Sequence, residues 1–316
     1  MAEKHIKKPA VEHILVSPEQ AGRRIDNYLT TYLKDVPKTR IYRMLRKGEV
    51  RVNGSRVKPD YRLVEQDNIR IPPVFRDTTE KIEQIPTPAM MGRINDNIIY
   101  EDDYILAINK PAGLAVHAGS GEQLGVIEIL RALRADQPFL ELVHRLDKAT
   151  SGCLLVAKDH RVLRQLHTML KENRVKKSYL ALLMGKLVRD TEVALALRKN
   201  ELRSGERMVQ VDTDGKGSKS HFRPKKIYKN ATLANVEIAT GRTHQIRVHA
   251  ASIGHPVAGD DKYGDREFNK SIRKYNLKRM FLHAESLVLK LPYSGLIKTI
   301  TAPLPDELLS VLGKLQ

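Results

Sequence analysis

Apolar residues spaced four apart near the start of the chain predict a first short helix. Its apolar face carries Ile25, Leu29 and Leu33. Pro37 then interrupts the chain, and a second helix is predicted over about residues 38–47. This helix is expected to end at Gly48, because glycine readily adopts the left-handed backbone that follows a helix C-terminus. The chain therefore begins with a pair of short amphipathic helices.

From residue 49 onward the spacing changes to alternation of apolar and polar residues. Asn53-Gly54 lies between two alternating stretches, which predicts a β-hairpin over about residues 49–57. Later in the chain, strands are predicted at 139–143, 154–158 and 179–184. Strands are therefore expected to outnumber helices in the larger part of the chain.

Composition divides the chain into four segments. A stretch rich in proline and charge, which includes Pro72-Pro73, Pro86 and Pro88, separates a small unit from the rest. The predicted segments are a loose basic tail at 1–19, a small unit at 20–80, a linker at 81–95 and a large domain at 96–316.

The charge balance points to a polyanionic partner. Lys and Arg number 55 against 37 Asp and Glu, which gives a formal net charge of +18. Nucleic acid is the first candidate for a protein this basic. An acidic membrane surface is the rival, but no stretch predicts a long basic amphipathic helix, and none approaches the ~20 apolar residues of a membrane span. We therefore expect a nucleic-acid partner and no membrane.

The N-terminus and the cysteine content predict a cytoplasmic protein. No apolar stretch follows the first charged residues, so they do not form a secretory signal. Cys153 is the one cysteine, so no internal disulfide can form, which fits a reducing compartment. Cys153 opens an apolar run and is interpreted as a small core residue.

Basic residues gather on one face of the second predicted helix. Arg40, Arg43 and Lys47 lie opposite its apolar stripe, with Lys38 and Arg46 beside them. A solvated helix surface is the plain interpretation, and phosphate binding is the functional one. Two helices followed by a hairpin with a V-x-V-N-G-x-x-V pattern resemble the S4 RNA-binding domain. That resemblance implies contacts to structured RNA, made mostly through its backbone.

A polar loop is predicted between the strands at 139–143 and 154–158. Residues 144–152 read His-Arg-Leu-Asp-Lys-Ala-Thr-Ser-Gly. Loops held between buried strands often carry catalytic groups, which makes Asp147 a candidate. Asp, Thr, Ser and Gly are also ordinary turn residues, so the residue types alone leave a purely structural turn open.

The whole string H-R-L-D-x-x-T-S-G resembles the signature of the large-subunit and related pseudouridine synthases. Further stretches resemble this family in the same order, at 109–117, 176–181, 241–249 and 261–264. The resemblance spans about residue 95 to the C-terminus, behind the S4-like unit. It implies an α+β protein, in which a large, mainly antiparallel mixed-sheet catalytic domain with a basic cleft follows a small S4-like α/β RNA-binding domain.

By this resemblance Asp147 is the catalytic carboxylate, Arg247 is its cationic partner, and Tyr179 packs against the uracil. Arg145 would fill the gap left by a flipped base, since the target nucleotide must leave the stack for its C1′ and C5 atoms to be reached. The remaining candidates for RNA contact are His144, Lys110 and Lys177. A merely solvated role is equally open for the two lysines.

The implied reaction needs no cofactor. It breaks the N1–C1′ bond of uridine, turns the base, and joins C5 to C1′. One carboxylate suffices because the leaving group is also the incoming nucleophile, whereas a glycosidase would normally use two. Asp147 could attack C1′ or remove a proton from C2′. Burial would raise its pKa, so a neighbouring cation is needed to keep it ionised.

Other functions fit the sequence less well. A non-catalytic RNA-binding or ribosome-assembly factor would not require Asp147, Tyr179 and Arg247 together, and a nucleoside hydrolase would need a base that activates water. His244, His249 and His255 lack the spacing of a metal site. Gly119-Ser120-Gly121 is not followed by the third glycine of a dinucleotide loop. No metal is expected, and nothing calls for more than a monomer. The modified uridines stay open.

Overall fold

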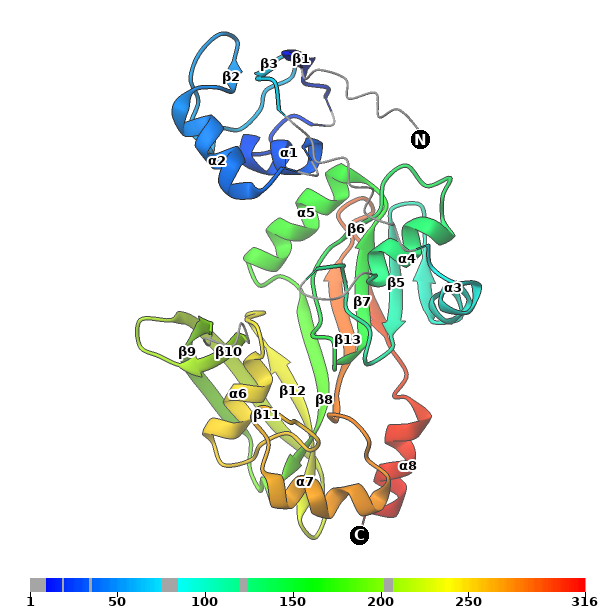
Figure 1. Cartoon of the computed structure of the whole chain (residues 1–316). Helices are drawn as coiled ribbons and strands as arrows, with labels where there is room; N and C mark the ends of the chain where they lie inside the picture. The colour runs from blue at the N-terminus through cyan, green and yellow to red at the C-terminus, as the bar shows by residue number, and fades with distance from the viewer. Residues whose placement is uncertain are drawn as a thin grey trace, which may run out of the picture. The chain divides into compact units, whose positions relative to one another are not determined.

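The computed structural model describes residues 10–18, 20–33, 36–74, 85–119, 124–201 and 207–315. The chain forms two compact units, residues 1–83 and 84–316 (Figure 1). Residues 120 and 121 of the glycine-containing loop considered above lie outside the described residues.

The first unit packs two helices against a three-stranded sheet. The helices are α1 (Ile25–Tyr32) and α2 (Lys38–Lys47), and Gly48 ends α2 in the left-handed conformation, with φ of 68°. Both predicted helices are therefore confirmed. The strands are β1 (Glu12–Leu15), β2 (Arg51–Val52) and β3 (Asn68–Ile71), in the order β1-β3-β2. The apolar stripes of both helices are buried in the core that they share with the sheet.

Two features of this unit differ from the sequence prediction. Residues 12–15, expected within a loose tail, form β1 and pair antiparallel with β3, because Ile14 packs against the core. The turn at Asn53-Gly54 is present, with φ of 50° and 78°. However, the second arm of the expected hairpin ends at Ser55, and β2 pairs with β3 instead. Pro59, which follows this arm, has no N–H to donate to the hydrogen-bond ladder that a longer arm would form.

The second unit is built on an 11-stranded sheet in which the strand order is β10-β9-β11-β12-β8-β13-β7-β5-β4, with β14 paired to β13 and β6 to β7. The strands are β4 (Ile98–Glu101), β5 (Ile105–Lys110), β6 (Glu141–Leu142), β7 (Ser151–Ala157), β8 (Lys176–Met184), β9 (Thr191–Glu201), β10 (Arg207–Val211), β11 (Lys216–Ile227), β12 (Ala231–Ile238), β13 (Leu282–Lys290) and β14 (Ile297–Thr301). The pairing of β13 with β7 is parallel and the other pairings are antiparallel. The predicted α+β class with a large, mainly antiparallel sheet is confirmed.

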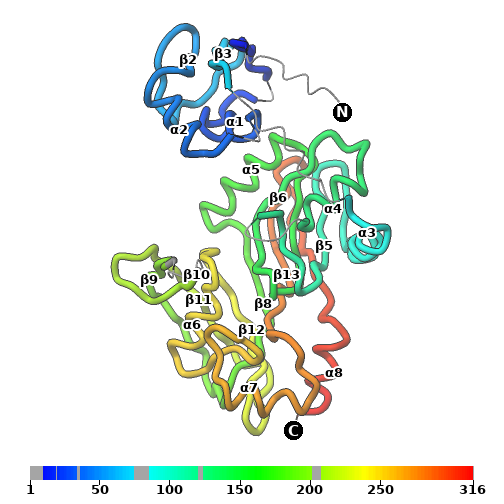
Figure 2. The backbone as a smooth tube through the Cα atoms, in the orientation of Figure 1, coloured from blue at the N-terminus to red at the C-terminus, as the bar shows by residue number. Residues whose placement is uncertain are grey.

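Helices cover both faces of this sheet. They are α3 (Pro88–Asn95), α4 (Val126–Leu133), α5 (His160–Lys171), α6 (Gln245–Ser252), α7 (Arg266–Ile272), the short 3₁₀ helix η1 (Arg273–Tyr275) and α8 (Asp306–Lys314). Figure 2 shows α6 close to β10 and β11. The predicted linker at 81–95 contains α3, because Thr87 caps the backbone N–H of Met90 and Pro88 occupies the first helical turn, where it needs no donor.

Strand β7 is buried on both faces, which explains its continuous apolar run. Leu154 and Val156 join the core beneath α3, α4 and α6, whereas Cys153 and Leu155 join the core beneath α5. Cys153 is fully buried, as expected of a core residue. Within the described residues, no helix combines the length and the apolar character that crossing a membrane requires.

Candidate active site

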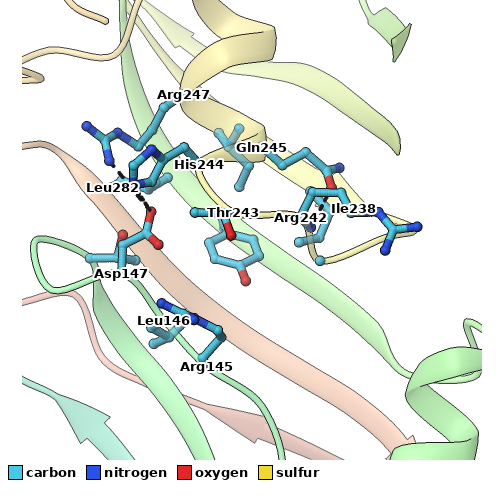
Figure 3. A pocket seen from close by; sticks show the side chains of 14 residues that line it. Arg145, Leu146, Asp147, Ile238, Arg242, Thr243, His244, Gln245, Arg247 and Leu282 are labelled. Carbon is cyan, nitrogen blue, oxygen red and sulfur yellow. Dashed lines mark hydrogen bonds and ion pairs between the residues drawn. The ribbon is translucent and has the colours of Figure 1, made fainter. Parts of the chain in front are cut away.

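Asp147 lies in the loop between β6 and β7, on the wall of a pocket. Four other parts of the second unit complete this wall: Tyr179 of β8, Ile238 of β12, residues 241–247 before and within α6, and Leu282 of β13 (Figure 3). The Asp147 side chain is 20% exposed. Candidate site residues that lie far apart in the sequence thus line one pocket.

The loop is fixed against its neighbours by backbone contacts. The Gly113 N–H donates to the Lys148 carbonyl at 2.8 Å, and the Thr150 N–H donates to the Asp147 carbonyl at 3.0 Å. Gly152 has φ of 112°, and a Cβ there would lie 2.2 Å from the Ala284 carbonyl oxygen. Glycine is therefore required where the loop enters β7, which accounts for the end of the His144–Gly152 motif.

Arg247 and His244 contact the same oxygen of Asp147. Arg247 Nη1 lies 3.7 Å from Asp147 Oδ2, and His244 Nε2 lies 3.9 Å from it. The placement of Arg247 agrees with the role expected from the motif. The proximity of His244 was not predicted, since the sequence had suggested it only as a rejected metal ligand.

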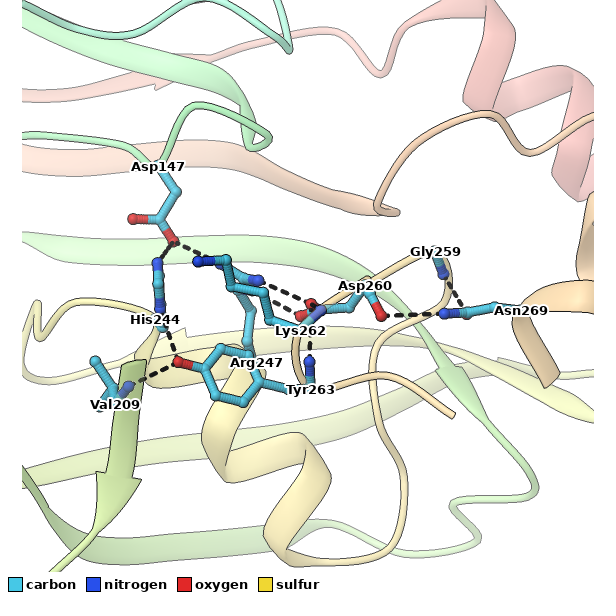
Figure 4. A network of polar contacts seen from close by, with 9 residues as sticks. All are labelled: Asp147, Val209, His244, Arg247, Gly259, Asp260, Lys262, Tyr263 and Asn269. Carbon is cyan, nitrogen blue, oxygen red and sulfur yellow. Dashed lines mark hydrogen bonds and ion pairs between the residues drawn. The ribbon is translucent and has the colours of Figure 1, made fainter. Parts of the chain in front are cut away.

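Asp260 is the closer partner of Arg247. Its two oxygens accept hydrogen bonds from Arg247 Nε at 2.6 Å and Nη2 at 2.8 Å, and its side chain is fully buried (Figure 4). Burial raises the pKa of Asp260, but Arg247 and the N–H groups of Lys262 and Tyr263 more than offset this, so the pKa lies below its usual value. The Tyr263 ring centroid lies 4.9 Å from the guanidinium carbon. Asp260 directly precedes a recognised motif, yet nothing in residue spacing marked it.

Tyr179 is the third expected site residue and lies in β8. It is 8% exposed and faces the pocket that contains Asp147. Burial, reinforced by the charge of Asp147, raises the pKa of its hydroxyl well above the usual value. Tyr179 is therefore a neutral phenol at physiological pH, able to donate a hydrogen bond and to pack against an aromatic base.

A buried polar network anchors α6 to the sheet. Ser218 Oγ donates to the Leu195 carbonyl, so it must accept from His249 Nε2, 3.0 Å away. His249 Nδ1 then accepts from Ser220 Oγ, and Ser220 Oγ accepts from Gln245 Nε2. Each hydroxyl and ring nitrogen of this hydrogen-bond network has a partner. His249 is thus occupied in holding the helix that carries Arg247.

The histidines once considered as ligands are separately engaged. His255 Nδ1 contacts the Met184 carbonyl at 2.7 Å, away from the contacts of His244 and His249. Among the residues that the structure describes, no three His, Cys, Asp or Glu side chains gather as a metal ion would require.

Three residues expected to contact RNA have structural partners instead. Lys110 is 0% exposed, and its ammonium donates to the carbonyls of Pro111, Leu114 and Lys148 at 2.8, 2.9 and 3.2 Å. These bonds leave no donor for a phosphate, so the expected contact of Lys110 is wrong. Burial lowers its pKa to about 7, against the opposing effect of Asp147. Lys110 joins the 111–114 turn to the loop of Asp147.

Lys177 and His144 are similarly turned inward. Lys177 is 7% exposed, donates to the Ala239 carbonyl at 3.3 Å, and has its pKa lowered by burial. His144 Nε2 accepts the Leu155 N–H at 3.1 Å. Burial and the nearby Lys177 charge lower the pKa of His144 to about 4, so it is neutral. Neither side chain offers a free cation to RNA in this structure.

The other expected RNA contacts are open to solvent to different degrees. Arg145 is exposed at the pocket edge, and Arg43 and Lys47 are exposed on α2. Arg40 is only half-exposed and forms an ion pair with Glu49 at 3.2 Å. The exposed cations of α2 are therefore Lys38, Arg43, Arg46 and Lys47.

A partly exposed carboxylate, a buried arginine and a neutral tyrosine line one pocket, on a chain with a separate basic helical unit. This combination is what an RNA-modifying enzyme that uses one carboxylate requires. Residues 104–252 match the family described as RNA pseudouridylate synthase, and residues 23–69 match the S4 domain. The chain belongs to the pseudouridine synthase family, and its first unit is an S4 domain.

Its relatives include two proteins named ribosomal large subunit pseudouridine synthase C. The protein from Pasteurella multocida is 50% identical, with 97% of this chain and 94% of the relative covered. The protein from Escherichia coli K12 is 49% identical, with 98% of each covered.

Solved structures agree with the fold. Human RNA pseudouridylate synthase domain containing 1 is 27% identical, with a TM-score of 0.56 over 70% of this chain and 87% of that one. Human RNA pseudouridylate synthase domain containing 4 superimposes with a TM-score of 0.61 at 22% identity, over 72% and 97% of the two chains, and supports the fold alone.

Proposed function

We propose that this protein converts uridines in large-subunit ribosomal RNA to pseudouridine, with Asp147 as the catalytic carboxylate. The observation that carries the proposal is the placement of Asp147, Arg247 and Tyr179 around one pocket. The substrate follows from relatives that share about half of their residues with this chain and are named for large-subunit RNA.

In the proposed reaction a flipped uridine enters the pocket and its base packs against Tyr179. Arg145, exposed at the rim, occupies the space that the base leaves. Asp147 then either attacks C1′ or removes a proton from C2′, and both routes release N1 of the uracil. The base turns within the pocket and C5 joins C1′, which breaks the Asp147–C1′ ester in the first route or is followed by return of the proton to C2′ in the second. C5 then loses its proton and N1 gains one, so the product is an isomer of uridine. The buried Arg247 keeps Asp147 ionised when RNA displaces water from the site.

The alternative is a binding protein that only chaperones ribosomal RNA. Such a protein gains nothing from a charged arginine buried beside a partly exposed carboxylate, because burying that charge costs free energy that RNA affinity does not need. We therefore favour catalysis. We further propose that the enzyme acts as a cytoplasmic monomer without a metal ion or other cofactor, and that the S4 domain binds RNA phosphates through Arg43 and Lys47, with a lesser contribution from Arg40.

The purified protein is expected to convert uridine to pseudouridine in large-subunit RNA transcripts without added metal or nucleotide. The product should remain in the RNA chain, since the departing uracil is the group that rejoins C1′. The measurement is chemical mapping of pseudouridine in the transcript, with and without a chelator. Release of free uracil would indicate a hydrolase, and RNA binding without any product would support the binding protein.

Arg43 and Lys47 are exposed, whereas Lys110 is buried. Replacing the first two should therefore affect RNA binding, and replacing Lys110 should affect stability. Arg43→Gln combined with Lys47→Gln should weaken RNA binding and reduce the slope of log affinity against log salt by ~1.4–1.8, because each phosphate contact contributes ~0.7–0.9. Lys110→Met should leave the affinity and the slope unchanged. It should instead lower the free energy of unfolding by about 1–3 kcal/mol, because three carbonyls lose their donor.

The matched control replaces two exposed lysines elsewhere, Lys229 and Lys314, with glutamine. RNA binding isotherms at several salt concentrations and urea unfolding curves cover all variants. An unchanged slope in the α2 variant would remove the S4 phosphate contacts from the proposal. A reduced slope in Lys110→Met would mean that Lys110 turns outward to RNA.

A further inference from the structure

His244 has an unusual backbone conformation that directs its ring to Asp147. It precedes α6 with φ of 54° and ψ of 18°, in the left-handed region, and its side chain makes no capping bond to the helix. This conformation is unfavourable for a residue with a Cβ. A residue at this position would ordinarily use its side chain to cap the helix. Here the ring instead lies between Asp147 and Tyr263 (Figure 4).

The contacts of His244 with Tyr263 and Asp147 indicate which ring nitrogen carries the proton. The Val209 N–H can only donate, and it donates to the Tyr263 hydroxyl oxygen at 2.8 Å. The hydroxyl has one hydrogen, and His244 Nδ1 lies 2.9 Å from it. The hydroxyl can donate this hydrogen to Nδ1, and Nε2 faces a carboxylate oxygen that can only accept, so we assign the proton of the neutral ring to Nε2. Burial lowers the pKa of His244, although the charge of Asp147 opposes this shift. The lowered pKa favours the neutral ring.

The protonated Nε2 faces the Asp147 oxygen that Arg247 also contacts. Both donors approach Oδ2, at 3.9 and 3.7 Å, and Figure 4 shows the other oxygen directed away from them. These separations exceed a hydrogen bond by about 1 Å, and catalytic contacts of this kind commonly shorten when substrate binds. The arrangement therefore distinguishes the two oxygens before any RNA is present.

We propose that His244, oriented by Tyr263, is a positioning residue that presents its Nε2–H to Oδ2 of Asp147 and so leaves Oδ1 to react with the ribose. The proposal rests on the pseudouridine chemistry proposed above. It holds for attack on C1′ and for proton removal from C2′, since either uses one oxygen.

A neutral donor has a specific use at this position. Arg247, held by its two bonds to Asp260, already supplies one cation, and a second cation beside Asp147 would bind both oxygens and lower their reactivity. An imidazole N–H stabilises the carboxylate without adding charge. Removing it should leave the ionised carboxylate with one donor fewer.

Other charged groups near His244 and Asp147 must be considered when the pH dependence of the rate is measured. Arg247, Asp260 and Lys262 face His244. Lys110 and Tyr179 also interact with Asp147, and Lys110 has a pKa of about 7. Each variant is therefore compared with the unmodified enzyme at the same pH, since these neighbours are common to both.

The test compares two replacements of His244 that differ in reach. His244→Gln can place an amide N–H near the position of Nε2, whereas His244→Asn reaches Tyr263 but not Asp147. Single-turnover rates at saturating RNA are measured from pH 5 to 9. We expect the Gln variant to retain the rate within about tenfold and the Asn variant to lose about a hundredfold. In the Asn variant the acidic limb of the profile should move to higher pH, with RNA affinity unchanged.

Tyr263→Phe tests the orienting contact, because it removes the hydroxyl and keeps the ring beside Arg247. It should slow the reaction about tenfold and shift the acidic limb in the same direction. Tyr100→Phe is the matched control, since Tyr100 loses a hydroxyl bonded to Asp102 outside the pocket, and it should behave as wild type.

A readout independent of activity is the ¹⁵N spectrum of the histidine ring nitrogens, with His244 assigned from the Gln variant. Protonated Nε2 and acceptor Nδ1 are expected, with mixed tautomers in Tyr263→Phe. A proton on Nδ1, or Gln and Asn variants slowed equally at every pH, would overturn the positioning role. If the wild-type enzyme forms no pseudouridine, the proposed function fails, and the spectrum still decides the orientation of His244.

Discussion

Asp147→Asn is expected to abolish pseudouridine formation, with a loss of roughly four orders of magnitude or more in the single-turnover rate. The amide has the size of the carboxylate but can neither attack C1′ nor accept the C2′ proton. RNA affinity should stay the same or increase slightly, because one negative charge is lost from the pocket wall. The measurement is single-turnover conversion at saturating RNA beside a binding isotherm.

The folded state should tolerate this replacement. Arg247 retains both hydrogen bonds to Asp260, so no buried cation is left without a partner. The unfolding free energy is expected to change by less than about 1 kcal/mol. Asp136→Asn, at an exposed position before β6, controls for loss of charge. Substantial turnover by the Asn variant would exclude the mechanism, and a loss of fold together with activity would support a structural role for Asp147.

Sequence patterns that span a few residues correctly predicted the two helices of the first unit. The helices α1 and α2 follow from the spacing of Ile25 and Leu29 and from Gly48, since helix propensity and capping depend on neighbours within a few residues. Pairing between distant strands does not obey such rules. The turn at Asn53-Gly54 formed as expected, but the partner of β2 was decided by the burial of Ile69 and Ile71 in β3.

The motifs identified residue types but not the directions of their side chains. Lys110 and Arg145 both lie in motifs of a basic, RNA-acting protein, and charge alone suggested the same role for both. Only the fold shows that three carbonyls surround Lys110 while Arg145 stays exposed. A strand end flanked by proline and turn residues can bury an ammonium or expose it, and sequence spacing does not distinguish the two.

Asp260 was missed because its function depends on a contact across a turn. It lies 13 residues after Arg247, a separation with no helical or strand periodicity. Its neighbours had been recognised only as a motif, without a partner for each residue. A buried arginine must have an acidic partner, and that requirement could have prompted a search of the nearby motifs once Arg247 was taken to be buried.

Asp260→Asn is expected to be the most disruptive single change outside the reacting carboxylate. The asparagine amide cannot neutralise Arg247, so a buried charge loses its partner, which typically costs about 3–5 kcal/mol of stability. Arg247 would then turn its free N–H groups to Asp147 and contact both oxygens. The rate per folded molecule should therefore fall by at least about a hundredfold, although Asp147 is unchanged.

The pH dependence of stability and a second substitution separate these two effects. The folded-state pKa of Asp260 is lowered, so its contribution to stability is fully present above the unfolded carboxyl pKa of about 4 and is lost as pH falls through the folded value. Urea unfolding should show wild type and Asp260→Asn converging below about pH 4. Adding Arg247→Gln to Asp260→Asn removes the unpaired charge and should restore much of the stability but none of the rate, because Asp147 then lacks its cation. Full activity per folded molecule in Asp260→Asn would mean that Arg247 keeps its position without Asp260, and that the two bonds of 2.6 and 2.8 Å stabilise the fold without orienting the site.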